Sequence, residues 1–174
     1  MTNEVRRKLW AQLGIPAGYA QRAGQRLQRE PKRLVHIGRA RDDGRILKLT
    51  PATARAWRKM QAAATADGIT LLPLSAFRSV ARQTTLIRRK LAHGESIADI
   101  LRVNAVPGCS EHHTGRALDL GAPGHLKLEA SFARTREFRW LKRHAAEFGF
   151  HLSYPRGNRQ GIAYEPWHFC CQPK

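Results

Sequence analysis

Apolar side chains recur at helical spacing in several parts of the chain. The clearest start is Thr50-Pro51, because a threonine hydroxyl caps a helix and proline is favoured at the first helical position. Apolar residues then recur every three or four positions until Asp67-Gly68, where the helix is expected to end. The same spacing predicts further helices over residues 4–13, 80–92, 96–102 and 131–148.

Short apolar runs bounded by glycine, proline or aspartate predict the strands. They cover residues 69–74, 116–120, 150–154 and 162–171. A turn at Asp42-Asp43-Gly44 between two further apolar runs is typical of a hairpin. Helices and short strands that do not alternate regularly favour an α+β fold, in which a small antiparallel sheet is flanked by helices.

The length of 174 residues suits one domain with its own core. Residues 1–48 are rich in arginine, glutamine, alanine and glycine, and they are predicted to form a basic extension packed on that domain. Residues 49–174 are predicted to form the domain itself. We expect a monomer.

The charge balance is strongly basic. Lysine and arginine number 31 against 13 acidic residues, which gives a formal net charge of +18. Such a surface indicates a polyanionic partner, which by charge alone is a nucleic acid, an anionic lipid or an anionic cell-wall polymer. The basic residues are spread along the chain, so no dedicated nucleic-acid motif is identified.

Targeting and cross-linking signals are few. No run of about 18 apolar residues predicts a membrane-spanning helix. The first 29 residues have basic side chains but no apolar segment of the kind found in a secretory signal. The protein is therefore expected to stay inside the cell, or its export signal is missing from this sequence. The three cysteines, Cys109, Cys170 and Cys171, do not form a paired disulfide framework.

Metal-binding residue types are concentrated in two stretches, Cys109–Leu120 and Tyr164–His168. His112 and Asp119 lie in the first, and His168 lies in the second. A catalytic zinc site uses three protein ligands and keeps a fourth position open. Asp119 stands between two leucines of a predicted strand, and a buried carboxylate is costly unless it is paired or binds a metal. The sequence therefore predicts a three-ligand metal site.

A carboxylate beside the predicted metal site suggests a general base. Glu165 lies three residues before His168, where it can reach a water molecule activated by the metal. Residues three apart on a regular strand face opposite ways, so the backbone is expected to deviate between them. Pro166 marks the predicted deviation.

Two further residues leave alternatives open. His113 competes with His112, because neighbouring residues of an extended segment point in opposite directions and spacing alone does not choose between them. Arg78 follows a predicted strand, where its guanidinium could stabilise an oxyanion or bind a substrate carboxylate. From charge alone, an ordinary surface arginine in an arginine-rich chain is the better explanation of Arg78.

Several linked motifs run in order through residues 50–171. They are S-x-F-R-S-x-x-x-Q from Ser75, P-G-x-S-E-H-x-x-G-x-A-x-D from Pro107, G-F from Gly149, Y-P from Tyr154 and Y-E-P-W-H from Tyr164. In these motifs the chain resembles the VanY-type D-alanyl-D-alanine carboxypeptidases. The wider group includes LD-carboxypeptidases, phage endolysins and proteins with the Hedgehog-like zinc fold.

The resemblance implies a Hedgehog/DD-peptidase-like zinc fold and one catalytic zinc ion. The implied ligands are His112, Asp119 and His168. Glu165 is the implied general base and Arg78 the group that polarises the scissile carbonyl, while Ser110 and Gln83 help to seat the peptide end. The implied reaction, by a DD- or LD-carboxypeptidase, removes a terminal D-alanine from a peptidoglycan stem peptide.

The chain also departs from the family pattern. Cys109 stands where the family commonly has an aromatic residue, and Ser153 stands where a basic residue often precedes the Tyr-Pro pair. The ending Phe169-Cys170-Cys171 replaces a more usual aromatic and basic one. These changes leave the predicted ligands intact and bear on substrate choice. The lack of a signal segment differs from wall-facing members and suits an endolysin-like or unconventionally exported protein.

Two other functions stay open. A peptidoglycan endopeptidase of the phage-endolysin type would cut within the stem or cross-bridge and release larger fragments in place of free D-alanine. A non-catalytic module would use the basic surface to bind an anionic wall polymer, and it would have no need of Glu165.

Overall fold

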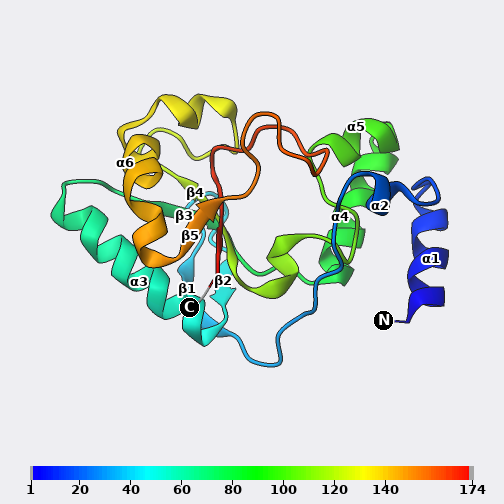
Figure 1. Ribbon diagram of the computed structural model, residues 1–174, viewed down its shortest axis with the longest axis horizontal. Coiled ribbons are helices and arrows are strands. Elements are labelled where there is room, and N and C mark those ends of the chain that lie inside the picture. Colours follow the sequence, from blue (N-terminus) through cyan, green and yellow to red (C-terminus); the bar gives the residue numbers. More distant parts are fainter. Residues whose placement is uncertain (1, 173–174) are drawn as a thin grey trace.

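A four-stranded antiparallel sheet forms the centre of the computed structural model, which describes residues 2–172 (Figure 1). The strands in their order across the sheet are β3 (Leu72–Ser75), β4 (Ala117–Gly121), β6 (His168–Cys171) and β5 (Phe150–Leu152). Every neighbouring pair is antiparallel. The predicted α+β fold with a small antiparallel sheet is therefore confirmed.

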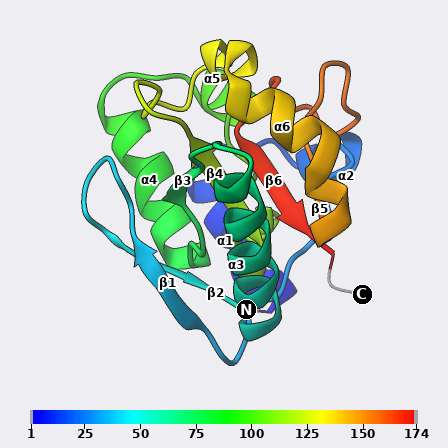
Figure 2. The same cartoon turned by 90° about the vertical axis from the view of Figure 1, so that its left-hand side faces the viewer.

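Helices lie on both sides of this sheet (Figures 1 and 2). One side is covered by α3 (Pro51–Ala66) and α6 (Arg136–His144), which share a core with the sheet that includes Trp57, Leu118 and Phe169. The helices on the other side are α1 (Asn3–Gln12), α2 (Tyr19–Arg22), α4 (Val80–Ala92) and α5 (Ile97–Arg102). They pack around a second, smaller core. Within residues 2–172, no helix combines the length and the apolar character needed to cross a membrane.

The predicted helix starts are confirmed by their caps. The Thr50 hydroxyl accepts the Thr53 amide at 3.3 Å, and Pro51 is the first residue of α3. Ser79 caps α4 in the same way, through the Arg82 amide at 3.1 Å. Each cap satisfies an amide that has no partner inside the helix, which is why these helices begin where the sequence predicts.

The prediction of one helix over residues 131–148 is wrong. The segment consists of a 3-10 helix (Ala130–Arg134), α6 (Arg136–His144) and a second 3-10 helix (Ala145–Phe148). Thr135 separates the first two, with an extended backbone at φ −74° and ψ 161° and a hydroxyl that accepts the Phe138 amide. A threonine inside a periodic apolar pattern therefore acts as a cap and interrupts the helix.

The predicted final strand over residues 162–171 is too long. Only His168–Cys171 pairs in the sheet, and the residues before it form a loop that ends in a turn. The His168 amide donates to the Glu165 carbonyl at 3.1 Å, which closes this turn across Pro166. The expected backbone deviation at Pro166 is thus present. The strands predicted over residues 69–74 and 150–154 are also shorter, as β3 and β5.

Residues 2–50 contact Val106 and Pro107, which lie just before the Cys109–Leu120 stretch. The predicted hairpin is confirmed as β1 (Val35–Arg39) and β2 (Ile46–Leu49). Ahead of it, the indole of Trp10 donates to the Pro107 carbonyl at 2.9 Å, and the Gln25 side-chain oxygen accepts the Val106 amide at 3.0 Å. The division of the chain at residues 48 and 49 stays a prediction.

Candidate metal centre

The alternation of side chains along β4 separates the core from the site. Leu118 and Leu120 point into the core beneath α3 and α6, so Asp119 between them points to the opposite face of the sheet. His168, the first residue of β6, is paired directly with Asp119 in the sheet register. Directly opposed residues of antiparallel strands have neighbouring side chains. The strand pairing therefore brings together Asp119 and His168, which are 49 residues apart in the sequence.

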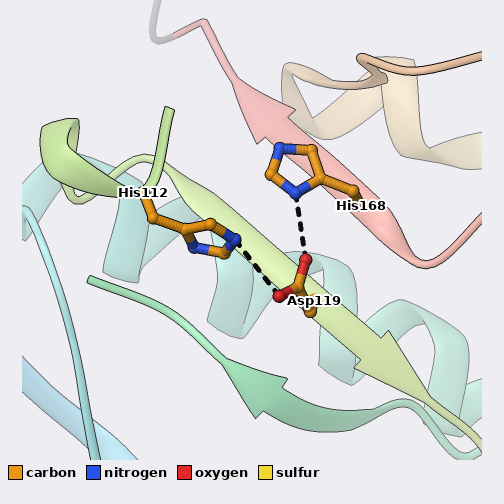
Figure 3. A group of neighbouring side chains, drawn as sticks. All are labelled: His112, Asp119 and His168. Carbon is orange, nitrogen blue, oxygen red and sulfur yellow. Dashed lines mark hydrogen bonds and ion pairs between the residues drawn. The ribbon is translucent and has the colours of Figure 1, made fainter. Parts of the chain in front are cut away.

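The third residue comes from a short 3-10 helix, η1 (Glu111–Thr114), that precedes β4. Gly115 ends this helix with φ +63°, in the left-handed region that favours glycine. A Cβ atom at this position would lie 2.8 Å from the Leu34 side chain. The turn returns the chain to β4 and brings His112 over Asp119, as Figure 3 shows.

Asp119 bridges the two histidines. One of its oxygens lies 3.1 Å from Nε2 of His112, and the other lies 2.9 Å from Nδ1 of His168. One potential ligand atom from each of the three residues lies within 4.8 Å of the others, and all three residues are buried. Two imidazole nitrogens and a carboxylate make up a donor set that zinc accepts in catalytic sites. The three residues therefore fit a zinc ion.

The hydrogen bonds of His112 and His113 to the surrounding backbone show which of the two histidines faces Asp119. Nδ1 of His112 lies 2.7 Å from the Ala76 carbonyl oxygen, which only accepts, so Nδ1 carries the hydrogen and the lone pair falls on Nε2. Both ring nitrogens of His113 form hydrogen bonds to backbone groups away from Asp119. Its Nδ1 donates to the Arg78 carbonyl at 2.6 Å, and its Nε2 accepts the Gly108 amide at 3.1 Å. The structure thus brings His112, and not His113, to Asp119.

Glu165 faces the same group from the turn before β6. Its carboxylate lies 3.9 Å from Nδ1 of His168 and lines the same cavity as the three potential ligands. Burial raises the pKa of Glu165 to about 7, although the nearby His168 acts to lower it. A carboxylate that titrates near neutral pH is suited to accept and release a proton.

Arg78 lies at the same cavity, after β3. Burial lowers the pKa of Arg78, although the charges of Asp119 and Glu165 act to raise it. Among the described residues, its buried Nε has no hydrogen-bond partner. A buried guanidinium with an unused donor is available to a ligand in the cavity.

The cavity has a volume of about 390 Å³. Ser110 lines it, as predicted for a residue near the substrate, but Gln83 does not. The Gln83 side chain is fully buried and donates to the Ala105 carbonyl at 2.8 Å, and Ala105 itself lines the cavity. Gln83 therefore lies one residue behind the cavity wall.

Two residues of the site have no predicted role. Tyr154 lines the cavity, and its ring centre lies 4.7 Å from that of His168. Glu111 accepts a hydrogen bond from Nε2 of His168 at 3.0 Å. Burial alone would lower the pKa of His168, but the hydrogen bonds to Asp119 and Glu111 raise it to about 10. The only sequence signal for either residue is its presence in a quoted motif, next to His112 for Glu111 and before Pro155 for Tyr154.

An α+β fold with a buried His-Asp-His group beside a carboxylate and an arginine defines a candidate metallohydrolase. Residues 46–174 match the family model VanY, described as D-alanyl-D-alanine carboxypeptidase. The chain therefore belongs to the VanY family, and the resemblance found in the sequence motifs is confirmed.

Relatives support the same family. A D-alanyl-D-alanine carboxypeptidase of Enterococcus faecalis is 31% identical over 117 residues, which cover 62% of this chain and 42% of that protein. The chain spans less than half the length of the first curated relatives it matches, with shares of 43% and 42%.

Solved structures share the fold. The LdcB LD-carboxypeptidase has a TM-score of 0.72 and 29% identity, with 82% of this chain and 69% of that chain covered. A variant of the vancomycin-resistance D,D-pentapeptidase VanY in complex with Zn(II) has a TM-score of 0.63 and 25% identity, with 84% of each chain covered. VanYB in complex with D-alanine-D-alanine has a TM-score of 0.66 and 25% identity, covering 84% of this chain and 81% of that chain. The predicted DD-peptidase-like zinc fold is confirmed.

Proposed function

We propose that this chain is a carboxypeptidase with one catalytic zinc ion, and that it removes a terminal D-alanine from peptidoglycan stem peptides. The observation that carries the proposal is the buried group of His112, Asp119 and His168, with Glu165 facing it from the same cavity. Membership of the VanY family and the likeness to DD- and LD-carboxypeptidases support the substrate class.

In the proposed mechanism, Glu165, Arg78 and Ser110 act on the peptide or on a proton. Zinc held by the three ligands supplies Lewis-acid activation of water and of the scissile carbonyl. Glu165 accepts a proton from the attacking water at its carboxylate oxygen and passes it to the leaving amine. Arg78 donates to the carbonyl oxygen as negative charge develops there. Ser110 contacts the peptide end, and Gln83 supports this contact indirectly by fixing the Ala105 carbonyl.

Products distinguish the proposed reaction from its rivals. The zinc-loaded protein is expected to release free D-alanine from a synthetic stem pentapeptide or tetrapeptide, measured by mass spectrometry. Release from the pentapeptide indicates a DD-carboxypeptidase, and release from the tetrapeptide indicates an LD-carboxypeptidase. Larger peptide fragments would instead identify an endopeptidase, and polymer binding without any hydrolysis would identify a non-catalytic module.

We propose that a basic groove beside the cavity binds an anionic cell-wall polymer. The groove has a volume of about 640 Å³, and its cationic lining residues are Arg82, Arg89 and Lys90, with His93 beside them. Leu86 and Lys90 line both the groove and the cavity, so the two hollows adjoin along α4. Glu95 is the only acidic residue in the lining, at 3.9 Å from Lys90. A mostly uncompensated positive surface attracts a polyanion.

The double variant Arg82→Gln, Arg89→Gln is expected to bind less tightly to isolated cell walls that carry anionic polymer. The loss should be largest at low salt, because added ions screen charges on an exposed surface. Cosedimentation at low and high salt measures it. A matched control is Lys142→Gln, Arg143→Gln, which removes two exposed charges from α6 on the other side of the sheet. Equal losses in both variants would point to net charge and not to this groove.

A further inference from the structure

We propose that Glu111 is a positioning residue of the metal centre, which holds the His168 ring so that its Nδ1 atom is presented to the metal. This inference rests on the proposed zinc-dependent function. It concerns a residue that makes no contact with the substrate cavity and acts through the histidine in front of it.

The two ring nitrogens of His168 face two carboxylates. Nδ1 lies 2.9 Å from an oxygen of Asp119, inside the ligand group, and Nε2 lies 3.0 Å from an oxygen of Glu111, on its outer side. A metal-binding imidazole offers a lone pair from one nitrogen and carries its hydrogen on the other. An ionised carboxylate only accepts hydrogen bonds. When a metal takes the place of the hydrogen between His168 and Asp119, Glu111 would therefore hold the remaining ring hydrogen on Nε2, and Nδ1 would offer its lone pair to the metal.

The second histidine is held differently. The outer nitrogen of His112 meets the neutral backbone carbonyl of Ala76, while the outer nitrogen of His168 meets a charged side chain. A hydrogen bond to a charged acceptor is roughly twice as strong as one between neutral groups. A carboxylate behind a histidine ligand also raises the basicity of the ligand. The orientation of the His168 ring consequently depends on the Glu111 side chain, which a substitution can remove, whereas the His112 ring is held by a backbone carbonyl.

The position of Glu111 suits a residue that orients the His168 ring. It does not suit a residue that contacts the substrate. Its side chain is 17% exposed, so water screens the carboxylate only weakly. It is absent from the lining of the cavity, which contains Glu165. Its backbone carbonyl accepts the hydroxyl of Thr114 at 2.6 Å, which fixes the η1 turn. Two neighbouring residues of one turn thus contact different members of the site. His112 lies against Asp119, and Glu111 lies against Nε2 of His168.

The test compares the zinc affinity of metal-free protein and its variants by competition with a chromophoric chelator. Glu111→Gln is expected to bind zinc about 10–100-fold more weakly, because an amide can donate to Nε2 and no longer keeps the hydrogen there. Glu111→Asp keeps the charge but is shorter, so its affinity should fall between those of Glu111→Gln and the unmodified protein. The control is Glu147→Gln, which removes a carboxylate 2.9 Å from His144 on the surface.

The outcomes separate this inference from the proposed function. Weaker zinc binding by Glu111→Gln, with the control unchanged, supports the positioning role. Equal zinc affinity of Glu111→Gln and the unmodified protein would overturn it while leaving the zinc enzyme intact. Failure of the unmodified protein to bind zinc would overturn the proposed function itself. If Glu111→Gln does not fold, Glu111→Asp provides the same comparison.

Discussion

Replacing Glu165 by glutamine is expected to lower kcat by roughly 10²–10⁴-fold, the range that a general acid–base residue contributes. The amide has almost the same shape as the carboxylate but neither accepts a proton from water nor delivers one to the leaving amine. Burial places the pKa of Glu165 at about 7, so the carboxylate can exchange protons near neutral pH. The amide removes that capacity at every pH.

Zinc content separates this effect from damage to the metal site. Glu165 lies 3.9 Å from Nδ1 of His168 and lies outside the three-residue group that can share a metal. Glu165→Gln is therefore expected to retain zinc at the level of the unmodified protein, measured by atomic absorption, while D-alanine release falls. Glu147→Gln, on the exposed surface, controls for the loss of a carboxylate. Full activity in zinc-loaded Glu165→Gln would rule out the proposed base.

The periodic part of the fold could be predicted from the sequence because its signals are local. The cap residues Thr50 and Ser79 act on amides three residues away, and they define the starts of α3 and α4 correctly. The same local signal was misleading at Thr135, where the apolar pattern continues across a cap and predicts one helix in place of three segments. Local patterns therefore locate helices well but do not show where a single side chain interrupts them.

The site could be predicted only as far as residue types allow. Spacing could not choose between His112 and His113, because the deciding partners, the carbonyls of Ala76 and Arg78, are about 35 residues away in the chain. Glu111 is a similar case, since its partner His168 is 57 residues away. The pairing of β3 with β4 brings Ala76 and Arg78 to the two histidines, and the pairing of β4 with β6 brings His168 to Glu111. No local pattern encodes these contacts. The roles of these residues stay predictions until the variants are measured.

Replacing Arg78 by glutamine is expected to reduce kcat by roughly 10²–10³-fold, the loss found when one oxyanion-stabilising donor is removed. The guanidinium is buried at the cavity, and its positive charge lies near both Asp119 and Glu165. Glutamine retains a hydrogen-bond donor but has no charge to offset the charge that develops on the carbonyl oxygen.

The backbone around Arg78 allows a clean test of its side chain. Its amide donates to the His112 carbonyl at 3.2 Å, and its carbonyl accepts from His113 at 2.6 Å, so these contacts survive substitution. Arg78→Lys keeps the charge but loses the planar pair of donors, and it should recover part of the activity if charge dominates. Arg88→Gln, at an exposed position of α4 that lines neither the cavity nor the basic groove, is the matched control in steady-state kinetics on the same peptide. Equal kcat values for Arg78→Gln and Arg88→Gln would remove Arg78 from the mechanism, because an arginine that acts on the developing oxyanion must matter more than an exposed arginine elsewhere.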